Sequence, residues 1–329
     1  MTERPDRIAL GDDLTVSRLI CGLWQVADLE KHGATLDPES AADALEGYAA
    51  AGFDTFDMAD HYGSAEVIAG RVLARFRAEQ RLLAFTKWCP APGPMTPEIV
   101  RRGVEERLDR LGVRQIDLLQ FHWWRFEHPA WLDALHELAR LKQEGLIKAI
   151  GVTNFDAAHL ALALADGVPI VSNQVSFSLI DRRAAGPLST VCRKTGVKLL
   201  AYGTLCGGFL SDAWLNRSEP QSLPDWSRSK YKRFIDVAGG WPALQATLAA
   251  AAKIARKYGV SIANVATRWA LDHDAVAACI IGARVTEREH RADNLKVFDF
   301  ALDDQDRAAL NEAFGATKTI PGDCGDEYR

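Results

Sequence analysis

The chain has 329 residues, of which 48% are hydrophobic and 25% charged, with a formal net charge of −5. This composition supports a large buried core and excludes an intrinsically disordered chain. The acidic excess argues against nucleic acid as the partner, and no apolar run is long enough to cross a membrane. We expect a cytoplasmic protein, because the charged N-terminus lacks a signal-peptide pattern and the six cysteines form no C-x-x-C pair.

Short apolar runs alternate along the chain with longer amphipathic stretches. A hairpin is expected first, over residues 8–19, with its turn at Gly11–Asp13. Several of the later runs are almost entirely apolar, which is typical of strands covered on both faces. The eight predicted strands are Arg18–Leu23, Phe53–Asp57, Leu82–Thr86, Ile116–Phe121, Ile147–Val152, Ile170–Gln174, Lys198–Tyr202 and Ala277–Ile281.

The stretches between these strands show helical periodicity, and several end at a glycine. Thr96 and Asp156 are expected to cap the helices that follow them. The predicted helices are Pro38–Ala51, Pro97–Leu111, Pro129–Glu144, Ala157–Ala165, Leu188–Lys194, Pro242–Tyr258, Glu287–Leu295 and Asp303–Glu312.

The repeating order of strand, loop, helix and glycine predicts one (β/α)8 barrel domain over residues 1–329. An open doubly wound sheet is the alternative, but the turn after the first strand, WQVADLEKHG, lacks the G-x-G-x-x-G motif such a sheet would need. Two segments fall outside the repeat, a long connection over residues 203–240 and a C-terminal tail over residues 314–329. Connections this long are usually functional.

Polar side chains follow most of the predicted strands, at the end of a barrel where catalytic groups lie. Each of these side chains could also have a purely structural role. A lysine at a strand end is often only solvated, and Asn154 could simply cap a helix. The residues that these strand ends bring to one face are Asp57, His61, Tyr62, Lys87, His122, Thr153, Asn154, Gln174 and Tyr202.

Four of these residues, Asp57, Tyr62, Lys87 and His122, could together transfer a proton to a substrate. The ordinary pKa of a tyrosine is near 10, and a neighbouring Lys87 ammonium would lower the pKa of Tyr62. Asp57 would hold Lys87, and His122 would hydrogen-bond a substrate oxygen. The group would then donate a proton to a developing alkoxide. None of these side chains supplies a hydride, so a cofactor is required. Asn154 and Gln174 suit a carboxamide, and Tyr202 suits stacking on a flat ring.

Seven stretches in this order resemble the aldo-keto reductase superfamily over nearly the whole chain: GFDTFDMADHYGSAE, FTKW, LLQFHW, IKAIGVTNF, SNQVSFSLIDR, LLAYGTLCGGFL and IIGARVTEREHRADNL. The resemblance implies a barrel closed at the bottom by the hairpin, and reversible carbonyl reduction with NADPH or NADH. It implies catalytic roles for Asp57, Tyr62, Lys87 and His122. It also implies cofactor contacts from Thr153, Asn154, Gln174, Tyr202, Gly203, Gly282, Arg284 and Asn294, with residues 203–240 covering the cofactor. Trp24, His61, Trp88 and Trp123 are expected to line the substrate mouth.

Two departures from the family pattern bear on the site. Met58 stands where the family usually has Ser or Thr, which alters packing beneath Tyr62. His290 stands where some members carry Arg, whereas Arg284 is retained and can meet a 2′-phosphate charge. We therefore predict NADP(H) as the cofactor, with NAD(H) as the alternative. The substrate is predicted to be a small carbonyl compound, alcohol or sugar.

Two other functions are compatible with such a barrel. A metal-dependent hydrolase would need clustered His and carboxylate ligands at strand ends. The first strand lacks an H-x-H motif, and the fifth and sixth strands end in amides, so no catalytic metal is expected. The alternative to an enzyme is a cofactor-binding regulatory subunit that senses redox state and has little turnover.

Overall fold

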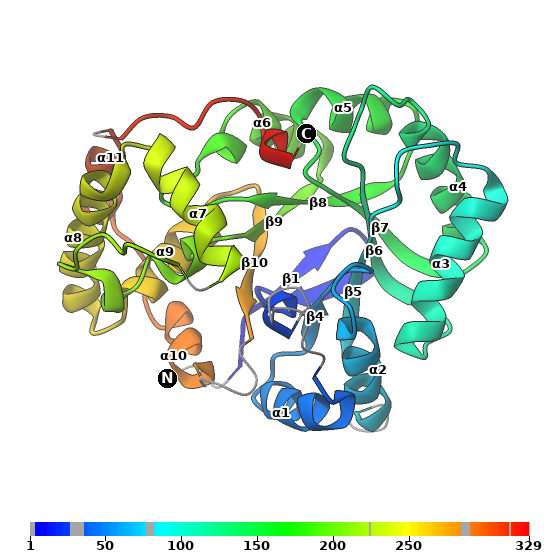
Figure 1. Ribbon diagram of the computed structural model, residues 1–329, viewed down its shortest axis with the longest axis horizontal. Coiled ribbons are helices and arrows are strands. Elements are labelled where there is room, and N and C mark those ends of the chain that lie inside the picture. The colour runs from blue at the N-terminus through cyan, green and yellow to red at the C-terminus, as the bar shows by residue number, and fades with distance from the viewer. Residues whose placement is uncertain are drawn as a thin grey trace.

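Eight parallel strands close into a barrel in the order β10-β3-β4-β5-β6-β7-β8-β9 (Figure 1). The structure is a computed structural model and describes residues 4–26, 36–76, 82–223, 225–283, 290–315 and 317–328. The predicted fold is confirmed, with strand bounds that differ from the expected ones by a few residues. The barrel strands are β3 Leu19–Gly22, β4 Thr55–Asp57, β5 Leu83–Trp88, β6 Ile116–His122, β7 Ile147–Thr153, β8 Ile170–Ser176, β9 Lys198–Tyr202 and β10 Val276–Gly282.

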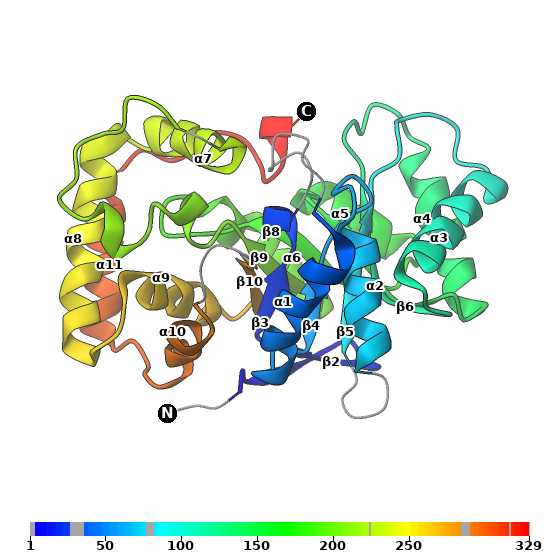
Figure 2. The ribbon, with the colours of Figure 1, turned by 60° about the horizontal axis from the view of Figure 1, so that its bottom comes forward.

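An antiparallel hairpin, β1 Arg7–Leu10 and β2 Leu14–Ser17, precedes the barrel. Its apolar side chains Leu10, Leu14 and Val16 are buried in one cluster with Phe85 and other inward-facing strand residues. The hairpin therefore covers one end of the barrel interior. Figure 2 shows it at the opposite end from helix α7 and the C-terminus.

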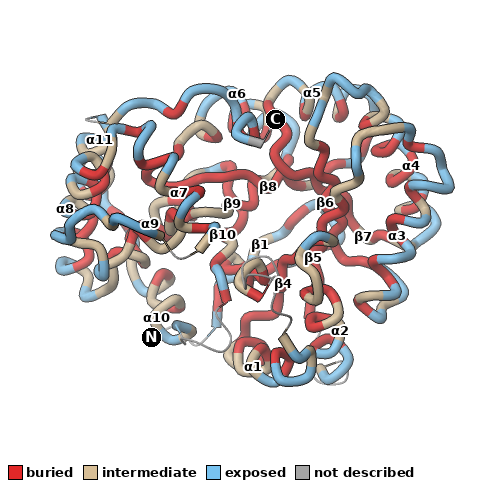
Figure 3. Tube along the Cα trace, in the orientation of Figure 1, coloured by how far each residue is buried: buried red, intermediate tan, exposed pale blue. Residues whose placement is uncertain are grey.

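Helices surround the barrel, and buried residues follow the strands while the outer helices carry exposed ones (Figures 1 and 3). The side chains of Thr96 and Asp156 accept hydrogen bonds from the first turns of α3 and α5, which confirms both predicted caps. The helices are α1 Pro38–Ala50, α2 Ala65–Arg75, α3 Pro97–Leu111, α4 Trp131–Gln143, α5 Ala157–Ala165, α6 Pro187–Thr195, α7 Trp226–Val237, α8 Gly240–Tyr258, α9 Ile262–Leu271, α10 Arg291–Leu295 and α11 Asp304–Gly315.

Three of these helices, α2, α7 and α9, were not predicted. Helix α9 follows α8 after a break of three residues, at which Ser261 caps its first turn. Helix α7 lies inside the long connection, where Asp225 accepts a hydrogen bond from the backbone N–H of Arg228. The predicted helix Glu287–Leu295 is observed only over Arg291–Leu295, because residues 284–289 lie outside the described residues.

The long connection after β9 is a folded layer. Phe209, Phe234, Trp241 and Leu244 are buried together in a cluster formed by α7, α8, α9 and α11. Trp214 adds a ring contact to Phe209 at 4.9 Å between centroids. The aromatic residues of this segment therefore stabilise it against α8, at the end of the barrel away from the hairpin (Figure 2).

Candidate active site

The carboxyl ends of adjacent strands bring Asp57, Lys87 and His122 to the same end of the barrel. Asp57 is the last residue of β4, Lys87 is next to last in β5, and His122 ends β6. Each is at most 6% exposed. Because all three strands are parallel and adjacent, their ends meet on one face of the barrel.

The carboxylate of Asp57 is the centre of a buried polar network. Its Oδ2 pairs with Nζ of Lys87 at 2.6 Å, and its Oδ1 accepts hydrogen bonds from the amides of Gln120 at 2.8 Å and Gln174 at 2.7 Å. Nζ of Lys87 also donates to the carbonyl of Met58 at 3.0 Å. Gln120 was not predicted, although it lies two residues before His122 and so on the same face of β6. Gln174, predicted as a carboxamide ligand, uses its amide nitrogen to bind Asp57 and Gln120.

Tyr62 lies beside this network, half-buried at the barrel mouth. Nζ of Lys87 is 5.2 Å from the centroid of its ring. The expected direction of its pKa was wrong: burial, followed by the negative charge of Asp57, raises the pKa of Tyr62 well above its ordinary value. The Lys87 charge is already compensated by Asp57, whereas the apolar surroundings disfavour a phenolate. Tyr62 is therefore a protonated phenol at neutral pH.

His122 is a neutral imidazole. Burial, with smaller contributions from His61 and Lys87, lowers its pKa to about 3. Its Nδ1 is 3.4 Å from Sγ of Cys89, and its ring lies 4.2 Å from that of Trp124. A neutral imidazole carries one N–H, so donation from the Cys89 thiol to Nδ1 leaves Nε2–H as a donor for a ligand oxygen.

Thr153, Asn154 and Tyr202 form a second polar group at the ends of β7 and β9. The Tyr202 hydroxyl donates to Oδ1 of Asn154 at 3.1 Å, and Asn154 adopts a left-handed backbone conformation with φ of 57°. The hydroxyl of Thr153 is buried and has no hydrogen-bond partner in the described part of the structure. An unsatisfied buried hydroxyl beside an amide fits a site completed by a polar ligand.

Of the other predicted cofactor residues, Gly203 and Gly282 lie at the carboxyl ends of β9 and β10. Gly203 directly follows β9, and a Cβ added there would clash with the ring of Tyr231 in α7. Gly282 ends β10 against the side chain of Gln25, whose Oε1 is buried without a partner among the described residues. Asn294 lies on α10. Arg284 falls outside the described residues.

The four predicted substrate residues divide into two pairs. The rings of Trp24 and His61 lie 4.9 and 4.8 Å from that of Tyr62, so both flank the mouth. Trp88 and Trp123 are 5% and 1% exposed and pack into the layer between barrel and helices. Trp88 follows Lys87 in the chain, and Trp123 follows His122. Because Lys87 and His122 face the barrel interior and side chains alternate along a strand, both tryptophans point away from that interior. The ring of Trp124, next in the chain, packs against that of His122, tilted from it by 31°.

Lys230 of α7 is a buried cation that sequence reasoning missed. Its ammonium lies 4.8 Å from the ring of Tyr202 and 4.9 Å from that of Tyr231. Burial lowers the pKa of Lys230 to about 8. Only the periodicity of apolar residues along α7 could have indicated that Lys230 lies on the buried side of this helix. The nearby charged residues Lys232 and Arg233 make that periodicity hard to recognise.

The C-terminal tail also reaches this end of the barrel. Arg183, which pairs with Asp181 at 2.8 Å, binds Glu327 at 2.9 Å and the carbonyl of Asp323 at 2.7 Å. A Cβ added to Gly325 would lie 2.7 Å from Cβ of Asn154. The tail therefore packs directly against the polar group at the end of β7.

This arrangement places Asp57, Lys87 and His122 at the carboxyl ends of the strands, where barrel enzymes carry their catalytic groups. The model of the Aldo/keto reductase family matches residues 18–314, and the chain belongs to this family. Within the described part of the chain, no helix is both long and apolar enough to cross a membrane.

Individual relatives match the chain over almost its full length. An NADH-specific methylglyoxal reductase from Escherichia coli K12 is 28% identical, over 93% of this chain and 97% of that protein. The structure of a glycerol dehydrogenase from Gluconobacter oxydans matches with a TM-score of 0.80 and 26% identity, covering 97% of this chain and 98% of that one. An aldo-keto reductase from Bombyx mori, solved with NADP, shares the fold with a TM-score of 0.70 at 20% identity, over 94% of this chain and 93% of that one. Membership of the family and the first two of these relatives support an NAD(P)(H)-dependent oxidoreductase.

Proposed function

We propose that this protein reduces small aldehydes and ketones, or oxidises the corresponding alcohols or sugars, with Tyr62 as the general acid. One observation carries the proposal: the buried Asp57–Lys87 ion pair lies beside the phenol of Tyr62 at the mouth of the barrel. A nicotinamide cofactor would supply the hydride. Family membership and the reductase and dehydrogenase relatives support this reaction class.

Tyr62 holds the proton that the substrate oxygen takes up. Its raised pKa keeps the phenol protonated at neutral pH, and an alkoxide is a much stronger base than a phenolate. Transfer to a developing alkoxide is therefore favourable despite the raised pKa. In the oxidative direction Tyr62 would take the proton as a phenolate, a form that burial and the charge of Asp57 disfavour.

His122 orients the substrate. A pKa of about 3 keeps the ring neutral over the physiological range, so it donates one hydrogen bond and does not compete with Tyr62 as an acid. Trp24 and His61 flank Tyr62 and restrict the angle at which a small carbonyl compound approaches.

Thr153, Asn154 and Tyr202 are the residues that would hold the nicotinamide end. The unpartnered Thr153 hydroxyl and the Asn154 amide offer hydrogen bonds to a carboxamide, and the Tyr202 ring offers a stacking surface. Residues 203–240 would cover the cofactor, because α7 packs on Gly203 directly after β9. We expect NADP(H) on the strength of Arg284, although the methylglyoxal reductase relative is NADH-specific. We also expect a cytoplasmic protein, which the six free cysteines favour.

The Tyr62→Phe variant tests the proposal. We expect kcat for carbonyl reduction to fall by about 10²-fold or more, the effect typical of losing general-acid help. Binding of NADPH and NADH, followed by fluorescence, should survive. Tyr258→Phe is the matched control, because that hydroxyl binds Asp306 at 2.7 Å in the layer of α8 and α11.

Parent-like turnover in Tyr62→Phe would remove Tyr62 from the reaction. Tight cofactor binding by the parent, with negligible turnover over a panel of aldehydes, ketones, alcohols and sugars, would instead favour a redox-sensing regulatory subunit.

A further inference from the structure

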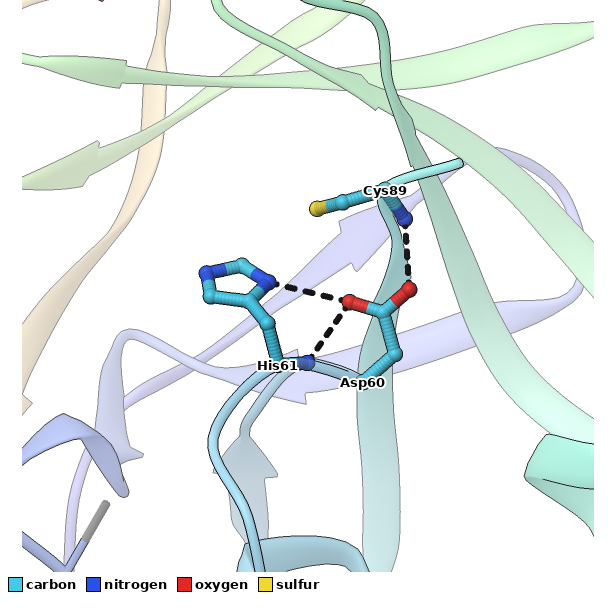
Figure 4. Close-up of side chains that lie close together, drawn as sticks. All are labelled: Asp60, His61 and Cys89. Carbon is cyan, nitrogen blue, oxygen red and sulfur yellow. Dashed lines mark hydrogen bonds and ion pairs between the residues drawn. The ribbon is translucent and has the colours of Figure 1, made fainter. Parts of the chain in front are cut away.

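Asp60, His61 and Cys89 bring three different metal-ligating groups together beside the barrel mouth (Figure 4). Their ligand atoms all lie within 4.8 Å of one another, and within the described ranges no other group of three has this property. In Figure 4 the imidazole and the thiol lie on the same side of the Asp60 carboxylate.

We propose that these three residues bind one divalent cation of the zinc type. A thiolate, an imidazole and a carboxylate suit Zn²⁺ or Co²⁺, whereas Mg²⁺ and Ca²⁺ prefer oxygen ligands throughout. Three protein ligands leave the fourth tetrahedral position to water. Cys89 binds as the thiolate and releases its proton to solvent.

The side chains need only a small adjustment to close around the ion. A tetrahedral zinc ion with bonds of ~2.0–2.3 Å holds its ligand atoms roughly 3.5 Å apart. Oδ1 of Asp60 already lies 2.9 Å from Nδ1 of His61. The backbone N–H of Cys89 donates to Oδ2 of Asp60 at 2.7 Å, which fixes the carboxylate next to the thiol. The side chain of His61 is 39% exposed, and it can turn toward the ion by giving up its hydrogen bond to Asp60.

Nearby positive charges are already compensated. The guanidinium of Arg107 is 3.9 Å from Oδ2 of Asp60, but it also pairs with buried Glu66 at 3.1 Å. Lys87 is paired with Asp57. Oδ1 of Asp60 accepts hydrogen bonds from the backbone N–H and from Nδ1 of His61, and a cation bound at Oδ1 would replace the second of these.

Occupancy of this site would inhibit the reaction, a consequence that rests on the proposed function. Sγ of Cys89 is 3.4 Å from Nδ1 of His122, and the ring of His61 is 4.8 Å from that of Tyr62. An ion bound to the Cys89 thiolate disrupts the contact between Sγ and Nδ1 of His122 and crowds the approach to Tyr62. Metal binding and carbonyl reduction therefore oppose each other.

The first measurement is direct and independent of turnover. Metal-free full-length protein is titrated with Co²⁺, followed by the near-ultraviolet thiolate-to-cobalt absorption band, and then with Zn²⁺ against a chromophoric chelator. We expect one equivalent of each metal to bind and Zn²⁺ to displace Co²⁺. Absence of the thiolate band at excess Co²⁺ would overturn the site.

Variants then identify the ligands. Cys89→Ser should abolish the band, and His61→Ala should keep it while weakening the affinity at least about tenfold, since even outer-shell partners of metal ligands contribute that much. Two variants are matched controls: His136→Ala removes an exposed histidine that also pairs with an aspartate, at 2.6 Å, and Cys192→Ala removes a buried thiol. Equal losses in the controls, or a band that survives in Cys89→Ser, would refute the assignment.

The last measurement concerns coupling to the reaction. Zn²⁺ should inhibit carbonyl reduction by the parent reversibly, with activity restored by a chelator, and should inhibit His61→Ala only at higher concentration. Binding without inhibition would overturn the coupling and leave the site standing. Inactivity of the parent without any metal would contradict the proposed function, and the cobalt spectrum would still decide the site.

Discussion

Three strands place donors around the carboxylate of Asp57: Lys87 from β5, Gln120 from β6 and Gln174 from β8. The Lys87 side chain is 4% exposed and so is that of Asp57, so both charges depend on each other rather than on water. A buried ion pair with its remaining lone pairs satisfied is tolerated, but removal of one partner leaves an uncompensated charge.

We predict that Asp57→Asn lowers the free energy of unfolding by roughly 3–5 kcal/mol, the usual effect of breaking a buried pair. The mechanism is the stranded Lys87 ammonium, so Asp57→Asn combined with Lys87→Met should recover part of the loss. Urea unfolding at pH 7 measures both. Asp43→Asn, which breaks an exposed pair with Arg75, is the control and should change stability little. An equally unstable double variant would mean that the carboxylate matters for its amide contacts and not for the charge.

At the residue scale, the sequence predicted the side chains that had been assigned a role in a recognisable motif. It did not predict the residues that contact and position those side chains. Asp57, Lys87 and His122 lie together because they end adjacent parallel strands. Gln120 lies inside the stretch LLQFHW but was given no role, and Cys89 directly follows FTKW. Their contacts to Asp57 and His122 depend on the positions of side chains in the folded barrel, which the sequence does not encode locally. Trp123 was expected at the mouth, but strand alternation places it outside the barrel.

At the scale of elements, α3 and β5 pack closely because α3 carries a glycine where it crosses the strand. A Cβ built on Gly103 would lie 2.6 Å from Nε1 of Trp88, closer than van der Waals contact allows. Trp88 is buried and directly follows Lys87 in β5. The helix therefore supports the strand end that positions the ammonium.

We predict that Gly103→Ala destabilises the protein by roughly 1–3 kcal/mol, the range for overpacking a core. The sign is diagnostic, because Gly→Ala inside a helix otherwise stabilises by roughly 0.5–1 kcal/mol. Gly93→Ala is the control, since an added Cβ there meets no atom within 4 Å. Urea unfolding of both variants gives the comparison. A more stable Gly103→Ala variant would show that Trp88 shifts freely and that this contact does not position β5.

Elements with strong local signals were predicted, and those that depend on tertiary contacts were not. Barrel strands are nearly continuous apolar runs, and α3 and α5 carry both caps and periodicity. Helix α7 has a polar sequence whose buried residues, including Tyr231 and Phe234, are identified only when α8 packs on them. Helix α2 begins directly after the motif at Tyr62, where the sequence reads as a polar turn.

For the whole molecule, the number and spacing of strands predicted the barrel. The residues that meet at its open end, by contrast, come from segments far apart in the chain. The end of β8, helix α7 and the C-terminal tail meet around Lys230, Arg183 and Glu327. Arg183 binds Glu327, and the negative charges of Glu327 and Asp181 act on Lys230 against the dominant effect of burial. Contacts between residues so far apart in the chain leave no periodic signal, so this arrangement was not predictable from the sequence.

The pH dependence of stability tests this assembly through Lys230. Burial lowers the pKa of Lys230 from 10.5 to about 8 in the folded protein, despite the opposing charges of Glu327 and Asp181. Below pH ~8 the residue is charged in both states, and the folded state bears the desolvation penalty of the ammonium, which Glu327 and Asp181 offset only in part. Between pH ~8 and ~10.5 the folded protein has lost this proton while the unfolded chain retains it, so Lys230 makes stability rise with pH in that window.

We therefore predict that Lys230→Met is more stable than the parent at pH 7, and that the difference shrinks as pH rises from 8 to 10. Methionine keeps the length of the side chain and its contacts with the rings of Tyr202 and Tyr231 without the buried charge. Lys232→Met, on the same helix, is the control: hydrogen bonds to Asp236 and Glu219 outweigh partial burial and raise the pKa of Lys232, so its removal should give no gain. Urea midpoints of the three proteins at pH 7 and pH 9.5 provide the measurement. A Lys230→Met variant less stable than the parent at pH 7 would contradict the prediction. It would mean that the ammonium holds α7 to the tail through its charge, and that this attraction outweighs the cost of burying the charge.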